Sequence, residues 1–304
     1  MNSRDDRPTV LVVGGTGGLL GRALLPELLP HYRIRSLHRH ERRAETTAGV
    51  EWVCANASTV ADWHAVLDGV DAVVNVAWYR WGPPSRFEEL YRGLERLLGS
   101  ARETGVGRFV QVSVPPAPPS LESSLPYLVF KRRFDTALAE SGLSYRTLRP
   151  TAMFGEGDVL LGVMMRSIHR YPFFPMFGDG NYHLSPIAAA DVAHAIRVEL
   201  SRSGQGTVDL GGPRRFRYRE LTDLMFRLLH KRPRYWEWTP RGAARMARWL
   251  QRVGSTLLYA YEVEWLLADL LGLPPYADLD RPLTPVEPYL EGVARRWNPP
   301  LSAA

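Results

Sequence analysis

The sequence has a single cysteine, Cys54, among its 304 residues, so no internal disulfide can form. This excludes the small disulfide-stabilised folds of secreted proteins and is typical of a reducing compartment. No apolar run reaches the roughly 18 residues that a membrane-spanning helix needs. The residues before Thr9 also lack the apolar core of a signal peptide. We therefore expect a cytoplasmic protein that meets a membrane, if at all, only at its surface.

Lysine is almost as scarce as cysteine. Of the 38 lysines and arginines, only Lys131 and Lys231 are lysine. Because arginine fills nearly every basic position, an arginine at any one site says little about function, and a position that stays lysine says more. The composition is otherwise that of a globular protein, with 45% apolar and 23% charged residues, which excludes a disordered or fibrous chain.

One segment carries the excess positive charge. Residues 214–252 contain 12 basic and 3 acidic side chains, and their aromatic residues include Tyr235, Trp236, Trp238 and Trp249. Two interpretations are open. The segment contacts a membrane surface or a protein complex, or it is a solvated face on which arginine stems cover aromatic rings. No nucleic-acid recognition motif accompanies the charge, so we expect no nucleic-acid partner.

Strands and helices alternate through the first half of the chain. Apolar runs predict strands at 9–13, 34–37, 50–53, 72–77, 108–114 and 144–148, and helical spacing predicts helices at 19–29, 60–67, 87–104 and 127–141. Such alternation is typical of βα units in a parallel, doubly wound α/β sheet of the Rossmann type.

The pattern also suggests two domains. We expect residues 1–150 to form a dinucleotide-binding domain whose sheet is completed by later strands. Residues 151–304 are expected to form a smaller, mostly helical substrate or lid part, with helices at 188–200, 218–229 and 242–271.

The first predicted strand ends in a glycine-rich turn, Val13-Gly14-Gly15-Thr16-Gly17-Gly18-Leu19-Leu20-Gly21. Gly15, Gly18 and Gly21 have the spacing of the dinucleotide fingerprint, between a strand and a helix as that motif requires. Glycine permits the tight turn, the approach of the backbone to a pyrophosphate and close packing of helix on strand. Amides at the helix start then hold the phosphates. A packing turn without a ligand is the alternative.

Other candidate cofactor-binding residues lie in this turn or near the carboxyl ends of predicted strands, where ligands bind in this fold. One more, Lys131, lies on the helix predicted at 127–141. Together these candidates are Thr16, Gly17, Leu19, Asn56, Ala77, Lys131 and Pro150.

The end of the second predicted strand distinguishes the two dinucleotides. An acidic residue there accepts the ribose hydroxyls of NAD, but the segment Ile34-Arg35-Ser36-Leu37-His38-Arg39-His40 has none. The guanidinium of Arg39 can pair with a 2′-phosphate through two parallel hydrogen bonds. The sequence therefore favours NADP(H) over NAD(H).

Tyr127 and Lys131 are four residues apart on a predicted helix, so their side chains share one face. A tyrosine hydroxyl with a pKa of about 10 is a poor acid–base group at neutral pH. A neighbouring ammonium stabilises the phenolate and can hold a cofactor ribose. The pair therefore predicts proton transfer coupled to hydride transfer, and a surface helix pair without function is the alternative.

These residues resemble the short-chain dehydrogenase/reductase superfamily, in its extended and atypical branches that include NAD-dependent epimerases and dehydratases. Residues 127–158 are similar to the family's active-site helix and sixth strand, and 108–113 to its fifth strand. The glycine turn and the Leu148-Arg149-Pro150-Thr151 segment also resemble the nucleotide-binding accessory subunits of respiratory complex I and their bacterial relatives. The resemblance covers residues 8–235.

The resemblance implies an NAD(P)-dependent oxidoreductase in which Tyr127 is the general acid/base and Lys131 its partner. Family enzymes have a serine or threonine after the fifth strand, where this chain has Val114, with Ser113 one residue earlier as a candidate assistant. Asn56 stands where the family has an acid near the adenine. Two functions are therefore open: an oxidoreductase acting on a small molecule, and a non-catalytic accessory or assembly protein that docks on a membrane-associated complex.

Aromatic residues Trp78, Tyr79 and Trp81 follow the fourth predicted strand, beside the expected cofactor. An aromatic wall there favours an apolar or planar substrate, and local packing is the alternative. His169, His183 and His194 do not have the spacing of metal ligands, so we expect no metal site.

Overall fold

The computed structural model describes residues 6–14, 17–38, 47–79, 82–158, 160–239, 241–242, 245 and 260–297. The chain divides into two compact units. Unit 1 comprises Met1–Val114, Pro118–Arg149 and Ala190–Val208, and unit 2 comprises Pro115–Ala117, Pro150–Ala189 and Asp209–Ala304.

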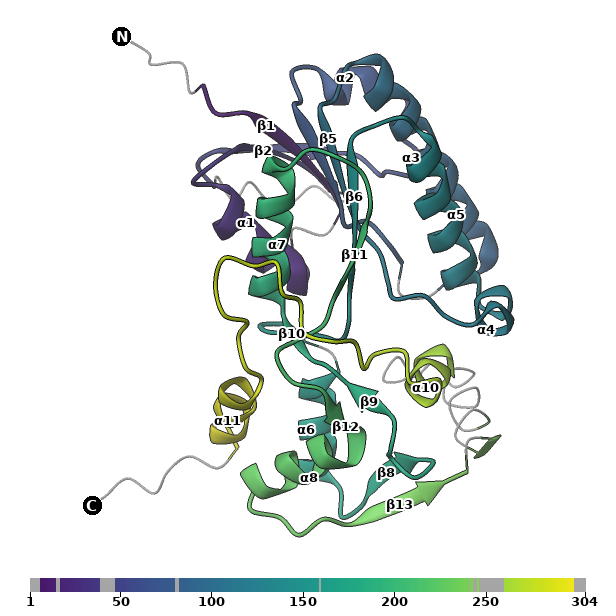
Figure 1. Ribbon diagram of the computed structural model, residues 1–304, viewed down its shortest axis with the longest axis vertical. Coiled ribbons are helices and arrows are strands. Elements are labelled where there is room, and N and C mark those ends of the chain that lie inside the picture. Colours follow the sequence, from purple (N-terminus) through teal and green to yellow (C-terminus); the bar gives the residue numbers. More distant parts are fainter. Residues whose placement is uncertain are drawn as a thin grey trace, which may run out of the picture. The chain divides into compact units, whose positions relative to one another are not determined.

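Unit 1 is built on a sheet of seven strands in the order β11-β6-β5-β4-β1-β2-β3 (Figure 1). Their bounds are β1 Thr9–Val13, β2 Arg33–His38, β3 Val50–Cys54, β4 Ala72–Asn75, β5 Arg108–Val112, β6 Tyr145–Pro150 and β11 Thr207–Leu210. Each is close to a strand predicted from the sequence, apart from β11.

The central strand β1 buries all five of its residues, as strands covered on both faces do. Val10 pairs in parallel with Ile34 of β2 on one side and with Ala72 of β4 on the other. The strand order therefore reverses at β1, and ligands bind at such a switch point beyond the carboxyl ends of the strands. The Rossmann-type fold predicted from the sequence is confirmed.

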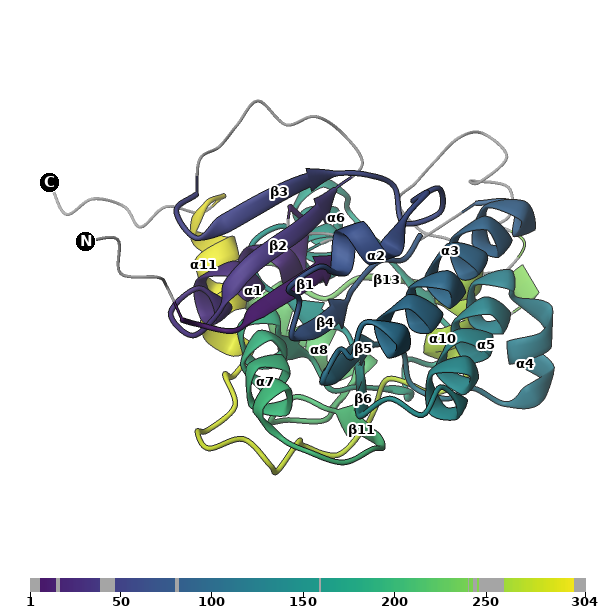
Figure 2. The same ribbon diagram turned by 90° about the horizontal axis from the view of Figure 1, so that it is seen from above.

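Helices cover both faces of this sheet (Figure 2). One face has α2 (Trp63–Leu67), α3 (Pro84–Glu103), α4 (Pro119–Ser124) and α5 (Pro126–Glu140), and the other has α1 (Leu19–Leu28) and α7 (Ala189–Ser201). On the second face, Glu27 of α1 accepts hydrogen bonds from His194 Nδ1 (2.8 Å) and Arg197 Nε (2.6 Å) of α7.

The ends of the two long helices follow from their sequence. Both α3 and α5 have proline in the first turn, where the missing N–H costs no helical hydrogen bond. They stop before Gly105 and Gly142, whose φ angles of 74° and 78° favour glycine. The stops predicted at these two glycines are confirmed.

The apolar core of unit 1 fixes α5 against the sheet. Phe87 of α3 stacks on Phe130 of α5 with ring planes 8° apart. Phe109 of β5 and Phe134 of α5 are fully buried. Each such side chain stabilises the fold by roughly 1.5–3 kcal/mol. The side chains that α5 turns toward β5 are therefore held in place by packing.

Unit 2 combines helices with short paired strands. β7 (Met153–Phe154) pairs with β10 (Ile187–Ala188), β8 (Phe174–Phe177) with β13 (Tyr235–Trp238), and β9 (His183–Leu184) with β12 (Phe216–Arg217). Its described helices are α6 (Leu161–Arg170), α8 (Tyr218–Leu228), α10 (Ala260–Leu267) and α11 (Glu287–Arg295). Most of the helix predicted at 242–271 lies outside the described residues. Within the described part of the chain, no helix has the length and apolar character needed to cross a bilayer.

Lys231, for which the sequence offers no explanation, has a structural role in unit 2. Its Nζ donates to the carbonyl oxygens of Ile168 (2.9 Å) and His169 (2.5 Å) in the last turn of α6. These carbonyls lie where a helix leaves oxygens without helical partners, and a cation there also interacts favourably with the helix dipole.

A buried ion network fixes α7 to the sheet of unit 1. The Glu199 carboxylate, 1% exposed, accepts hydrogen bonds from Arg146 Nε (2.8 Å) and Arg202 Nη1 (2.9 Å). Arg108, which is also buried, lies 3.4 Å from the same carboxylate through Nη2 and donates from Nε to the Glu199 carbonyl (2.9 Å). Burial lowers the pKa of the Arg108 guanidinium, and Glu199 acts in the opposite direction. A single carboxylate therefore forms ion pairs with arginines from three segments.

We expect Glu199→Gln to lower the free energy of unfolding by about 3–5 kcal/mol, because it leaves Arg108 buried without a counter-charge. Urea denaturation followed by circular dichroism measures this. Arg102→Ala is the matched control, because Arg102 is exposed on α3 and has no ion pair among the described residues. Its effect should stay below about 0.5 kcal/mol. A loss under about 1 kcal/mol for Glu199→Gln would show that the network does not hold α7.

Candidate functional site

Gly14, directly after β1, allows the first turn to touch the chain that follows β4. Its φ angle is 80°, and a Cβ atom at this position would lie 2.5 Å from the Cα of Ala77. Any side chain at position 14 would therefore push these two loops apart. The close approach places Ala77 beside the turn that the sequence predicts to hold a pyrophosphate.

The start of α1 leaves backbone amides available. Gly18 is the N-cap residue of α1, and no side chain among the described residues caps this helix. Amides in the first turn have no helical partner and attract anions. Gly17 precedes this cap, Leu19 is the first helical residue, and Gly21 is buried. Gly15 and Thr16 lie outside the described residues.

A pair of buried amides ties the ends of β4 and β5 together. Asn75 Nδ2 donates to Gln111 Oε1 (2.7 Å), and Asn75 Oδ1 accepts from the backbone amide of Ala77 (3.0 Å). Both side chains are fully buried. Because buried amides need partners, this pair fixes the path of the chain from Asn75 to Ala77.

The remaining predicted cofactor residues lie at other strand ends. Asn56 follows β3, and its Oδ1 accepts from the amide of Ser58 (3.1 Å), which stabilises a turn. Pro150 is the last residue of β6. Arg39 follows β2 directly and lies outside the described residues.

Lys131 points from α5 toward the end of β5 and is only 3% exposed. Its Nζ donates to the carbonyl oxygen of Val112 (2.8 Å) and lies 4.5 Å from the centre of the Trp78 ring. Burial lowers the pKa of Lys131 to about 8, and the Asp135 carboxylate acts in the opposite direction. The ammonium is thus enclosed between a carbonyl and an indole.

Tyr127 lies one helical turn before Lys131 on α5 and is half-buried. Its ring meets Trp78 edge to face, with centroids 6.2 Å apart, and contacts Phe87 in the same way at 6.3 Å. Trp78 therefore touches both members of the predicted pair, and its buried indole N–H has no hydrogen-bond partner among the residues that the structure describes. Tyr79 also packs on Phe87 (6.3 Å). Trp81 lies outside the described residues.

Ser113, the predicted assistant, is 2% exposed and donates from Oγ to Oδ2 of Asp135 (2.5 Å). Arg132 Nη1 donates to the same oxygen (2.9 Å) and Nη2 donates to the Val114 carbonyl (2.8 Å). Burial raises the pKa of the Asp135 carboxyl, although the Ser113 hydrogen bond and the charges of Lys131 and Arg132 oppose that shift. Asp135 thus engages the serine hydroxyl within the protein.

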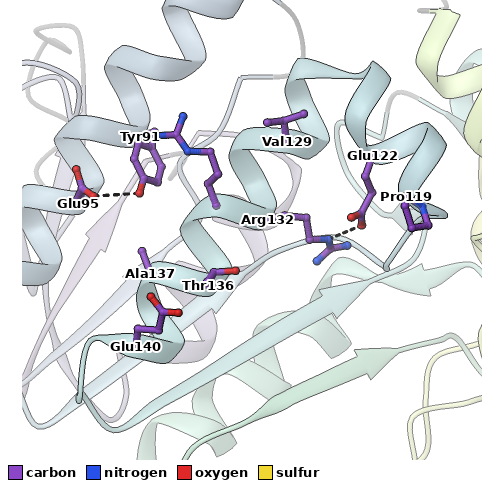
Figure 3. Close-up of a pocket in the computed structure, with 10 residues that line it drawn as sticks. Tyr91, Glu95, Pro119, Glu122, Val129, Arg132, Thr136, Ala137 and Glu140 are labelled. Carbon is purple, nitrogen blue, oxygen red and sulfur yellow. Dashed lines mark hydrogen bonds and ion pairs between the residues drawn. The ribbon is translucent and has the colours of Figure 1, made fainter.

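The outward face of α5 has a hollow of about 600 Å³, shared with α3 and α4 (Figure 3). It is lined by Tyr91, Glu95, Pro119, Glu122, Val129, Arg132, Arg133, Thr136, Ala137 and Glu140. Within its lining, Tyr91 donates to Glu95 of the same helix (3.0 Å), and Arg132 of α5 donates to Glu122 of α4 (2.8 Å). Lys131 and Phe134 leave α5 on its sheet-facing side, so this hollow is separate from the predicted cofactor site.

Sequence reasoning missed four residues of this site. Asp135 continues the four-residue spacing of Tyr127 and Lys131, and that spacing was a usable signal. Gly14 belongs to the glycine-rich turn after β1, but only the structure shows its contact with Ala77. The pairing of Asn75 with Gln111 joins two strands, and no local pattern indicates it.

A doubly wound parallel sheet with a glycine turn at its switch point defines a nucleotide-binding protein of the Rossmann type. The chain belongs to the NAD(P)H-binding family, whose model matches residues 14–197. That segment runs from Gly14 into α7 and includes Tyr127, Lys131 and Asp135. The chain therefore contains a nicotinamide-dinucleotide-binding domain.

Two curated proteins are similar to the chain over much of its length. It is 27% identical over 240 residues to mitochondrial NADH dehydrogenase (ubiquinone) 1 alpha subcomplex subunit 9 of Arabidopsis thaliana, covering 74% of this chain and 59% of that protein. It is 24% identical over 257 residues to chloroplastic divinyl chlorophyllide a 8-vinyl-reductase of Cucumis sativus, covering 77% and 60%. The chain thus spans about three fifths of the length of these relatives. The predicted resemblance to complex I accessory subunits is confirmed.

A solved structure supports the fold. A nucleoside-diphosphate-sugar epimerase from Staphylococcus aureus superposes with a TM-score of 0.73, covering 93% of this chain and 99% of that one at 14% identity. The predicted resemblance to the extended short-chain family is confirmed at the level of the fold.

We expect Lys131 to make stability depend on pH. Its pKa falls from 10.5 to about 8 on folding, so between these values the unfolded chain holds a proton that the folded chain has lost. The free energy of unfolding therefore rises with pH across this window, by up to about 3 kcal/mol from this residue. Urea titrations of the wild type and Lys131→Met across the window measure the difference, with Arg102→Ala as the control for loss of an exposed charge. Parallel pH curves for the wild type and Lys131→Met would refute it.

Proposed function

We propose that the protein is an NADP(H)-dependent oxidoreductase of the short-chain type, acting on an apolar or planar small molecule. The observation that carries the proposal is the pair on α5: Lys131 lies against the end of β5, and Tyr127, one turn earlier, packs on the same Trp78 ring that covers Lys131. The Gly14 turn and the uncapped start of α1 suit a dinucleotide pyrophosphate. Trp78 lies beside both residues of the pair and supplies an apolar surface for a substrate.

In this proposal the protein's own groups manage the proton. When bound, the cofactor supplies or accepts a hydride. Tyr127 gives a proton to, or takes one from, the reacting oxygen of the substrate. The Lys131 ammonium stabilises the phenolate form of Tyr127 and anchors the cofactor ribose. Assistance by Ser113 requires its hydroxyl to leave Asp135.

The preference for NADP(H) depends on the end of β2. This strand, Arg33-Ile34-Arg35-Ser36-Leu37-His38, has no carboxylate to accept ribose hydroxyls, and Arg39 follows it directly. A guanidinium there pairs with a 2′-phosphate and forms no equivalent contact with NAD.

We expect NADPH to bind at least about tenfold more tightly than NADH, which corresponds to about 1.4 kcal/mol. Arg39→Ala should remove the difference, since it deletes the phosphate partner, while Arg102→Ala should keep it. Fluorescence titration of each variant with both nucleotides is the measurement. Equal affinities in the unaltered protein would overturn the preference.

A second function is favoured by a different observation. The Lys131 ammonium is covered by Trp78, and the Ser113 hydroxyl is engaged by Asp135, so two groups of the predicted chemistry already have protein partners. We therefore keep as the alternative a non-catalytic protein that retains its nucleotide and docks on a membrane-associated complex through residues 214–252. The similarity to a subunit of NADH dehydrogenase supports it. In either case we propose a cytoplasmic location, with membrane contact only at the surface.

Replacing Tyr127 distinguishes the two functions. If the protein is an oxidoreductase, Tyr127→Phe should lower NADPH oxidation by a panel of carbonyl compounds about 10²- to 10⁴-fold, since the proton donor is lost. NADPH binding should remain within about threefold of the wild type, a change of less than 1 kcal/mol. Tyr91→Phe, which removes a hydroxyl from the separate hollow, is the matched control.

Lys131→Arg sharpens this experiment, because it keeps the charge and changes the geometry. Full turnover in Lys131→Arg would show that the lysine is not required. Tight NADPH binding by the wild type without oxidation by any compound of the panel, and with no effect of Tyr127→Phe, would favour the accessory function.

A further inference from the structure

Three large apolar side chains stand out from the surface of unit 2. Tyr171 is 60% exposed, Phe173 is 52% exposed and Trp236 is 61% exposed, and these are the exposed large hydrophobic residues of the described chain. A tryptophan this exposed is unusual on the surface of a protein in water. Three such rings in two neighbouring segments mark an interaction site.

The pairing of β8 with β13 (Figure 1) brings the two segments that carry these residues side by side. The strands are parallel, with Phe174 opposite Tyr235, and the amide of Phe174 donates to the carbonyl of Arg234 (2.9 Å). Phe173 lies directly before β8 and is exposed, whereas Phe174, the first residue of the strand, is buried. Trp236 lies opposite Pro175, which is also exposed, and its ring lies 4.7 Å from that of Trp238.

Three exposed arginines lie close in sequence to the rings. Arg170 precedes Tyr171, and Arg232 and Arg234 precede Trp236, and all three are exposed. None of the three has an ion pair with any residue that the structure describes. By contrast, the nearby Arg219 forms an ion pair with Glu237. The acid adjacent to Trp236 is therefore already neutralised, and the surface has a net positive charge.

We propose that this aromatic–arginine face, formed by Arg170, Tyr171, Phe173, Arg232, Arg234 and Trp236, docks on the surface of an anionic lipid bilayer. Tryptophan and tyrosine favour the headgroup region, where the ring is in apolar surroundings and its polar atom is hydrated. Arginines at the same depth contact lipid phosphates. Exposed rings and arginines occur together along these two segments. Such a mixture suits a bilayer surface, which offers both lipid phosphates and apolar chains to whatever contacts it.

The proposal is independent of whether the nucleotide site turns over. It replaces the general expectation of contact through residues 214–252 with a defined face that includes residues 170–173, outside that segment.

The test is co-sedimentation of the full chain with vesicles of phosphatidylcholine alone and of phosphatidylcholine with phosphatidylserine. We expect binding at least about tenfold tighter to the anionic vesicles, and weaker binding as salt is raised. The double variant Arg232→Ala/Arg234→Ala should bind about 30-fold more weakly, since each arginine near such a surface contributes about fivefold. Phe173→Ala and Trp236→Ala should each weaken binding about tenfold without changing its salt dependence.

Arg102→Ala, which removes an exposed arginine of unit 1, is the matched control and should bind as the wild type does. Thermal unfolding and NADPH binding confirm that each variant is folded and keep this test separate from the function of the nucleotide site. Equal binding to both vesicle types would overturn the proposal. So would anionic binding that Phe173→Ala and Trp236→Ala leave unchanged. Absence of vesicle binding together with binding to polyglutamate would assign the face to an acidic protein instead.

Discussion

Parallel strand pairing determines where this protein can place functional groups. Every strand of a parallel sheet ends at the same edge, so residues far apart in sequence become neighbours there. Gly14 follows β1, Ala77 follows β4 and Ser113 follows β5, so all three lie at this edge. Two contacts then set the detail: the absence of a Cβ at Gly14 lets the first turn reach Ala77, and packing of Phe134 against β5 aims Lys131 at the Val112 carbonyl. The site is thus a consequence of the sheet, and its geometry depends on packing contacts within the protein.

Both lysines of this arginine-rich chain donate to backbone carbonyls. Lys231 serves the end of α6, and Lys131 serves the end of β5. A lysine ammonium is compact and fits between a carbonyl and an indole ring, whereas the planar guanidinium of arginine is larger and needs several acceptors. Local geometry therefore accounts for a lysine at each of these two positions. Lys131 has this structural role in addition to the chemical one proposed for it. Ser113 likewise has a structural contact besides its proposed role, because its hydroxyl donates to Asp135.

The sequence predicted the parts of the fold that depend on local pattern. Runs such as Thr9–Val13 and stops such as Gly105 and Gly142 carry their own signal, and the corresponding elements lie close to the expected positions. Short strands of unit 2 such as His183–Leu184 were missed, because two residues have no periodicity and their pairing is decided by tertiary contacts. In the site, the Tyr127–Lys131 spacing was visible in the sequence, but the cover that Trp78 provides was not. Contacts between side chains from different strands and helices are not encoded in any window of the sequence.

The edge strand β11 begins after the segment that the family model recognises has ended. The amide of Thr147 in β6 donates to the carbonyl of Gly206, just before β11 (2.9 Å). The amide of Thr151, just after β6, donates to the carbonyl of Leu210, the last residue of β11 (3.1 Å). Glu199 also lies beyond residue 197, and with it the charge that balances Arg108. A chain shortened to the recognisable segment would expose a row of unpaired strand amides, the kind of edge that recruits other chains into aggregates. The segment that the family model recognises therefore ends before the segment that the sheet needs in order to fold.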